Sequence, residues 1–244
     1  MRTTRSATAA LLLVTATWGS TFVLIKDLLE RVPTLDFLAV RFTIAAVAMA
    51  VVAPRAVARL SAETRRRGVV VGVIYGVAQI LQTEGLTHTD ASVSGFVTGM
   101  YVVLTPVIAA VVLRQRIGRL GWSAVALATV GLGFLSLRGL SIGFGEGITF
   151  ASAILYAVHI VALSAWSTAR DAYGLAVVQM AVIAALCFAT TGWNGVVLAD
   201  RPQDWVSIVY MAIVAGALAM LLQTWAQAHL PATRAAIIMT MEPV

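Results

Sequence analysis

Long apolar runs separated by short polar turns make up most of this chain. The runs are 18 to 23 residues long, and an α-helix of about 20 residues spans the ~30 Å hydrocarbon core of a bilayer. Eight such runs predict eight membrane-spanning helices, and another run begins at Ala232. The expected fold class is an all-α integral membrane protein, with spans at residues 7–25, 36–53, 68–86, 91–113, 120–137, 148–167, 172–191 and 205–226.

One face of the span at residues 91–113 is polar. Four hydroxyl side chains follow the spacing i, i+4, i+7 and i+11, which places them on one side of a helix. Pro106 lacks a backbone N–H, so it leaves a carbonyl that lipid cannot satisfy. This face is therefore expected to line a cavity rather than contact acyl chains, and its residues are Ser94, Thr98, Tyr101 and Thr105.

Three other spans also carry polar side chains where hydrocarbon would surround them. In the third span Tyr75, Gln79 and Gln82 share a face, which we expect to meet the hydroxyl row across a short polar turn. Trp18 lies near the bilayer centre, beyond the reach of interfacial tryptophans, so a cavity lining is favoured over packing. For His159 a cavity role and a satisfied core role remain equally open.

The third span begins with overlapping GxxxG repeats formed by Gly68, Gly72 and Gly76. Glycines at this spacing let a neighbouring helix approach closely, so this half of the span is expected in the packed interior.

Two charges lie within or near the spans. Arg41 is the only basic residue well inside a span, and Glu84 is near the end of the third span. For Arg41, snorkelling or pairing within the protein, with Asp36 or Glu84, stands level with a substrate role. For Glu84 we favour pairing with Arg41, because an opposite charge offsets the cost of burying both groups. A substrate role for Arg41 and a proton-carrying role for Glu84 remain alternatives.

Composition and charge limit the class of protein. Hydrophobic residues make up 60% of the 244 residues and charged residues 11%, with a mean hydropathy of +0.91, which is too apolar for a soluble domain. The net charge of +6 could suggest nucleic acid, but the basic residues alternate between loops. Under the positive-inside rule they predict a cytoplasmic N-terminus, with twelve inside: Arg2, Arg5, Arg55, Arg59, Arg65, Arg66, Arg67, Arg114, Arg116, Arg119, Arg170 and Arg234.

The chain repeats itself after about five spans. Residues 229–244 share with residues 87–107 a polar turn, a start rich in small residues, and a Pro-Val pair. An odd number of spans per unit gives two copies of inverted topology. The predicted units are a five-helix repeat at residues 1–139 and a second repeat at 140–244. The second is expected to be incomplete, because only 13 residues follow from Ala232 and they would make ~20 Å of helix.

These residues resemble the EamA-like permeases of the drug/metabolite transporter superfamily. The resemblance rests on the segments at residues 18–26, 41–42, 82–107 and 241–244. It implies ten spans in two inverted five-helix repeats, around a cavity lined by spans one, three, four, six, eight and nine. The residues it implies near the transport path are Trp18, Ser20, Gln79, Gln82, Thr98, Tyr101, Glu242 and Pro243.

The predicted function is secondary transport of a small metabolite, amino acid or amphipathic drug across the cytoplasmic membrane by alternating access. No cofactor or metal is expected. The expected partners are the substrate and the lipid bilayer, without nucleic acid, and a homodimer stays open. A membrane-embedded enzyme is disfavoured, because no paired acids or metal-ligand spacing occur in the loops. A non-transporting scaffold would not need aligned polar rows.

Overall fold

The computed structural model describes residues 2–114, 143–191 and 195–239, with seven further positions between 118 and 130. In this part of the chain all regular structure is helical, which confirms the predicted all-α class. Its helices are α1 (Arg2–Gly19), α2 (Thr21–Leu29), α3 (Thr34–Val52), α4 (Ala62–Thr87), α5 (Ala91–Thr98), α6 (Tyr101–Val112), α8 (Phe144–Trp166), α9 (Ala172–Thr191), α10 (Pro202–Ala212), the π-helix η1 (Ile213–Leu218), α11 (Ala219–Gln227) and α12 (Ala232–Met239).

Seven helical segments of the described chain are long and apolar enough to cross a membrane. They correspond to the predicted spans except the fifth, since most of residues 120–137 lie outside the described residues. The predicted ninth span begins at Ala232, where α12 starts. Apolar side chains such as Val51, Val111 and Val206 are more than 70% exposed, as expected for positions that face lipid.

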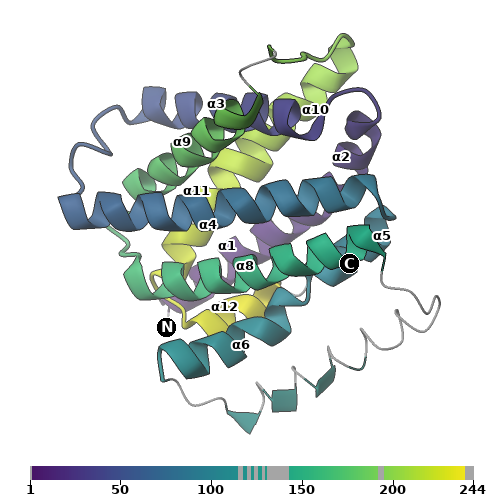
Figure 1. Cartoon of the computed structure of the whole chain (residues 1–244). Helices are drawn as coiled ribbons and strands as arrows, with labels where there is room; N and C mark the ends of the chain where they lie inside the picture. The colour runs from purple at the N-terminus through teal and green to yellow at the C-terminus, as the bar shows by residue number, and fades with distance from the viewer. Residues whose placement is uncertain are drawn as a thin grey trace.

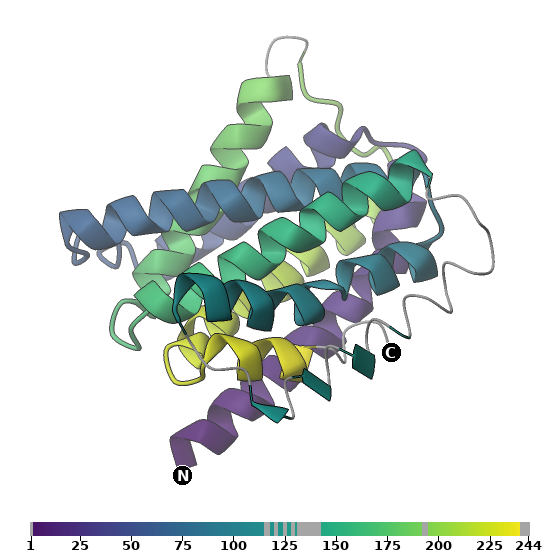
Figure 2. The same cartoon turned by 60° about the horizontal axis from the view of Figure 1, so that its bottom comes forward.

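The helix α4 crosses the middle of the bundle (Figure 1). It packs against α8 along much of its length and against α9, which also packs on α3. On another side, α1 contacts α11 and α12 (Figure 2). Segments far apart in the sequence therefore form one bundle.

Two glycine contacts explain why α4 sits so deeply. A Cβ on Gly72 would lie 3.2 Å from the Cα of Gln179, and a Cβ on Gly76 would lie 2.9 Å from a methyl of Leu186. The predicted close approach at the GxxxG face is confirmed, and the partner is α9.

Three of the spans depart from a regular α-helix. The first is divided between α1 and α2 at Ser20, and the fourth between α5 and α6 at residues 99–100. Around the second break, Met100 N–H bonds to the Val97 carbonyl and Val102 N–H to the Gly99 carbonyl, both at 3.1 Å, which are i→i+3 bonds. Pro106 cannot donate to the Val102 carbonyl, so the regular ladder is lost there. The third departure is the π-helix between α10 and α11.

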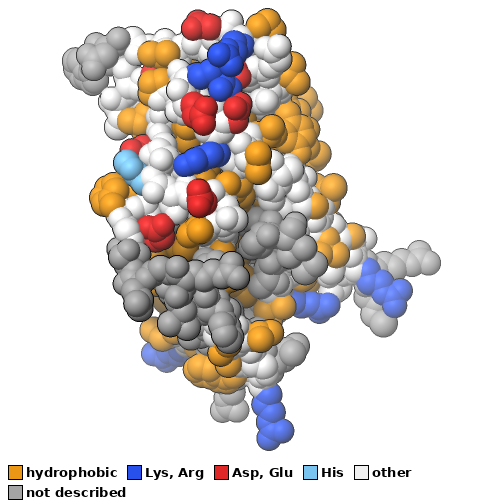
Figure 3. Space-filling model, turned by 90° about the vertical axis from the view of Figure 1, so that its right-hand side faces the viewer, with side chains coloured by type: hydrophobic (Ala, Val, Ile, Leu, Met, Phe, Trp, Pro, Cys, Tyr) orange, Lys and Arg blue, Asp and Glu red, His pale blue; other side chains and the backbone are white. Residues whose placement is uncertain are grey.

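The two ends of the bundle differ in charge. One end, which we call the acidic end, carries residues 27–31, the α4–α5 turn at 88–90, residues 143–146 and 200–204. Figure 3 shows Asp and Glu side chains gathered on this face beside few Lys or Arg. The cluster of arginines at 55–67 lies between α3 and α4 and in the first turns of α4, at the opposite end. The arginine cluster and the acidic end therefore lie at opposite ends of the bundle.

Gly85 lies at a close contact between α4 and α8. A Cβ there would overlap Thr149 Oγ1 and would lie 2.9 Å from the Gly145 carbonyl oxygen. We predict that Gly85→Ala destabilises the protein by about 1–3 kcal/mol, because the two backbones must separate. Thermal unfolding in detergent measures it. Gly147→Ala on α8 is the matched control, since its Cβ would meet nothing within 4 Å, and equal melting of both variants would contradict this account of the packing.

Candidate functional site

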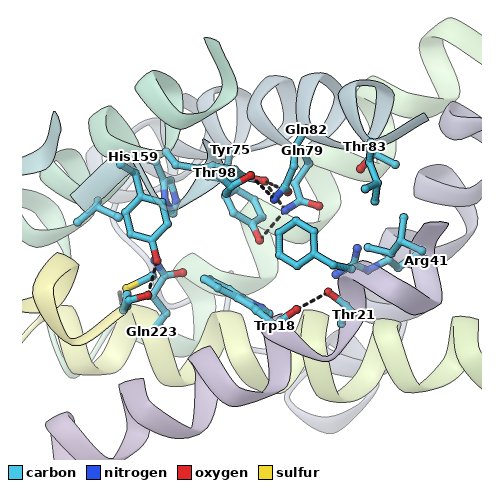
Figure 4. A pocket seen from close by; sticks show the side chains of 17 residues that line it. Trp18, Thr21, Arg41, Tyr75, Gln79, Gln82, Thr83, Thr98, His159 and Gln223 are labelled. Carbon is cyan, nitrogen blue, oxygen red and sulfur yellow. Dashed lines mark hydrogen bonds between the residues drawn. The ribbon is translucent and has the colours of Figure 1, made fainter. Parts of the chain in front are cut away.

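A small polar pocket lies where the broken helices meet. Its walls come from α1, α2, α3, α4, α5 and α6 and, from the second half of the chain, α8, α11 and α12 (Figure 4). Trp18 and Thr21 flank the first break, and Thr98 and Tyr101 flank the second. The free volume of about 40 Å³ holds only a few waters.

A network of amides and phenols joins α4 to α5 and α8 across the pocket. Gln79 Nε2 donates to the hydroxyl of Tyr156 at 2.6 Å and to that of Tyr75 at 3.2 Å. The Tyr156 hydroxyl donates to Gln82 Oε1 at 2.6 Å, and Gln82 Nε2 donates to Thr98 Oγ1 at 3.1 Å. The third and fourth spans therefore meet through their polar rows, as the sequence predicted.

Two side chains of the first half bind the backbone of the π-helix region. Trp18 Nε1 donates to the Ala215 carbonyl at 2.8 Å, and Arg41 Nε donates to the Met211 carbonyl at 3.2 Å. A π-helix replaces i→i+4 bonds with i→i+5 bonds, and these two side chains give carbonyls in and beside it a further donor. Trp18 therefore both lines the pocket and binds the backbone of the π-helix.

Arg41 is the only side chain with a permanent charge among the described residues that line the pocket. It is 2% exposed, and its guanidinium carbon lies 5.0 Å from the ring centre of Phe42 and 5.8 Å from that of Phe37. Its Nη1 has no hydrogen-bond partner. A buried guanidinium that bonds one carbonyl and two aromatic faces is only partly compensated.

His159 takes both of the roles that the sequence left open. It lines the pocket, and its Nε2 lies 2.8 Å from Gln179 Oε1 on α9. Gln179 Nε2 donates to the Leu175 carbonyl at 3.2 Å, so its oxygen accepts from the imidazole. Gln223 also lines the pocket, and its Oε1 is buried without a partner.

The expected pairing of Arg41 with Glu84 or Asp36 is wrong. The Glu84 side chain is 46% exposed and lies 3.7 Å from His88 Nε2. It follows Gln82 by two residues, or about 200° of helical turn, so it points away from the pocket. Asp36 accepts hydrogen bonds from the Thr191 hydroxyl and from the Val197 N–H.

Some predicted site residues lie elsewhere. Ser94 and Thr105 are fully buried but do not line the pocket, and Thr105 Oγ1 donates to the Tyr101 carbonyl. Ser20 lies on an exposed surface, 2.9 Å from the Tyr210 hydroxyl. Of the four hydroxyl residues predicted to share one face, only Thr98 and Tyr101 line the pocket. Glu242 lies outside the described residues.

The sequence reasoning did not single out Phe22, Thr83 or Met239, which also line the pocket. Phe22 and Thr83 are each four residues after a predicted lining residue, Trp18 and Gln79. The i+4 spacing could have found both of them.

Several polar contacts join the helices at the acidic end. Lys26 Nζ donates to the carbonyls of Leu86 and Thr89 at 2.7 and 2.8 Å, where α4 ends. Arg31 Nη2 lies 2.8 Å from Asp204 Oδ1 and also pairs with Asp27. Its hydrogen bond with Asp204, and then the one with Asp27, raises the pKa of Arg31, which therefore stays charged.

A further contact at this end joins the two halves of the chain. The Thr89 hydroxyl donates to Glu146 Oε1 at 2.6 Å. Together with the Arg31–Asp204 pair, this contact connects residues 1–114 to residues 143–239 at the acidic end.

A bundle of spanning helices around an internal polar pocket defines a multi-pass membrane protein. The EamA-like transporter family matches residues 5–137 and 143–244, and the chain belongs to this family. It is 30% identical over 239 residues to an "Uncharacterized transporter" of Archaeoglobus fulgidus, covering 98% of this chain and 75% of the relative. A solved structure titled "Crystal structure of protein" has the same fold, with a TM-score of 0.74, 19% identity, and coverage of 98% and 85%. The predicted resemblance and the expectation of a transporter rather than an enzyme are confirmed.

The Tyr156 hydroxyl binds both Gln79 and Gln82 at the centre of the amide network. We predict that Tyr156→Phe lowers the free energy of unfolding by about 1–3 kcal/mol, because Gln82 Oε1 loses its donor. Thermal unfolding in detergent measures this loss. Tyr210→Phe is the control, since its hydroxyl pairs with Ser20 at an exposed site where water replaces the bond. If Tyr156→Phe melts no lower than Tyr210→Phe, the network is not a stabilising element.

Proposed function

We propose that this protein is a secondary transporter that moves a small molecule by alternating access through the pocket described above. The observation that carries the proposal is the position of the pocket. It is lined from both predicted repeats, residues 1–139 and 140–244, and it adjoins every interrupted span of the described chain. Interrupted helices with polar groups at mid-membrane are typical of transporter binding sites.

The small pocket requires movement of the helices for a substrate to enter. A free volume of about 40 Å³ is far below the ~300 Å³ or more of small-molecule sites. The Arg31–Asp204 and Thr89–Glu146 contacts join the two halves at the acidic end. In our proposal these contacts break when that end opens, and the two predicted inverted repeats rock against each other around the pocket.

The proposed orientation in the cytoplasmic membrane places the N-terminus and the arginine-rich end inside. The acidic end then faces outward, and the contacts there form the outer gate. The proposed substrate is a small metabolite, amino acid or amphipathic drug, and the remaining partner is the lipid bilayer.

Thr98 lines the pocket and is therefore a suitable position for a labelling test. Thr105 lies on α6, beyond the break between α5 and α6, and does not line the pocket. In a background where Cys187, the only cysteine, is replaced by alanine, we predict that Thr98→Cys reacts with a membrane-impermeant thiol reagent. The reaction should abolish uptake by proteoliposomes, because the modified side chain fills the small site. Uptake is measured with a panel of radiolabelled amino acids and cationic dyes.

Thr105→Cys in the same background is the control, since its side chain is fully buried outside the pocket. It should label slowly and keep its uptake. Equal labelling of the two cysteines, or unchanged uptake after Thr98→Cys is modified, would contradict the proposed path. Failure of the wild type to transport any member of the panel would count against the transport proposal itself.

A further inference from the structure

Arg41 carries a hydrogen-bonding capacity that the described residues do not use. Its Nε is bound to the Met211 carbonyl, but its Nη1 is buried without a partner. In Figure 4 the guanidinium points from α3 into the pocket, toward the space between Gln79 and Thr21. An unused donor on a buried cation is costly, and here it faces the site where a substrate would bind.

No acidic side chain of the described residues neutralises this charge. The carboxylate of Asp36 bonds Thr191 and the Val197 N–H, and that of Glu84 lies beside His88 at the surface. The other ion pairs of the described chain involve Arg31 and Arg67, near the two ends of the bundle. Within the membrane core a cation in this position favours an anion as its partner.

The rest of the described pocket lining is neutral apart from the titratable His159. Amides, hydroxyls and phenols such as Gln79, Thr98 and Tyr101 supply hydrogen bonds without charge, and Phe22 and Ile25 supply apolar contact. One cation balances one negative charge. A monoanion is therefore matched, whereas a phosphate dianion would leave an excess charge in a dry site.

We propose that Arg41 binds the carboxylate of the transported molecule, so that the pocket selects small monocarboxylates over their neutral amides. This inference rests on the proposed transport function. Guanidinium and carboxylate form charge-assisted hydrogen bonds, and Nη1 makes one while Nε keeps its bond to the π-helix region. A carboxylate bound at Nη1 would thus share the guanidinium with the hydrogen bond that joins α3 to the Met211 carbonyl.

The test uses pairs of ligands that differ only in the acid group: phenylacetate with phenylacetamide and 4-methylpentanoate with its amide. Binding to the purified full chain in detergent is measured by ligand-dependent thermal stabilisation. Transport is measured separately, by uptake into proteoliposomes. We expect at least one acid to bind about tenfold or more tightly than its amide, as a charged hydrogen bond predicts.

The variants assign this preference to Arg41. Arg41→Gln should lose the preference, and Arg41→Lys should keep part of it, because the charge remains without the guanidinium geometry. Arg67→Gln is the matched control. Arg67 pairs with Glu63 in the first turns of α4, away from the pocket, so this variant should keep the preference for acids. If Arg41→Gln fails to fold, the wild-type preference and the Arg41→Lys result decide the question.

The outcomes separate the two proposals. Acid-selective binding that depends on Arg41, without uptake, supports the site and contradicts transport. Uptake of amides or cationic dyes with no preference for acids supports transport and overturns the carboxylate site. A wild type that binds acids and amides equally also overturns the carboxylate site. If Glu242→Gln then gained a preference for acids over amides, the carboxylate of Glu242 would be the partner of Arg41. An Arg41→Gln protein that melts lower but keeps the preference makes Arg41 purely structural, which also overturns the proposal.

Discussion

Backbone carbonyls that leave the α-helical pattern inside a membrane must find other donors, and this constraint organises the protein. Lipid offers none, so an unsatisfied group there costs several kcal/mol, or about 4–8 for transfer into hydrocarbon. Trp18 and Arg41 donate to the carbonyls of Ala215 and Met211, in and beside the π-helix η1. These two bonds fix α1 and α3 of the first half against the second half.

The same departures from regular helix create the pocket. Where α1 ends before α2 and α5 before α6, polar side chains converge instead of facing lipid. Lys26 applies the same principle at the acidic end, where its ammonium binds carbonyls at the end of α4. The groups that hold the two halves together therefore include residues that line the pocket, such as Trp18 and Arg41. Packing alone, as at the glycine face of α4 against α9, holds the helices together where no polar group is needed.

Much of this arrangement follows from the sequence, because the period of a helix is fixed. Apolar length located the spans, and the spacing of Tyr75, Gln79 and Gln82 correctly predicted one polar face. The errors have physical causes as well. The hydroxyl row presupposes a continuous helix through residues 99–100. The pairing of Glu84 with Arg41 rests on opposite charge alone, whereas the helical face of Glu84 turns away from the pocket.

Other features leave no sequence signal. The π-helix Ile213–Leu218 reads IVAGAL, which is as apolar and regular as any spanning segment. The partner of Arg41 is a backbone carbonyl 170 residues away, and a carbonyl has no residue type that a pattern could identify. The contact of Lys26 at the acidic end is likewise with backbone carbonyls, those of Leu86 and Thr89.

In the proposed transport cycle the two halves of the chain move against each other around the pocket. Cysteines in place of Arg31 and Asp204, in a Cys187→Ala background, can be joined by a short cleavable thiol cross-linker across the acidic end. The account predicts that cross-linking stops uptake into proteoliposomes and that cleaving the linker restores it. A cross-link between cysteines at Glu63 and Arg67, within α4 alone, should have no effect. Uptake that continues unchanged with Arg31→Cys and Asp204→Cys linked would contradict the account.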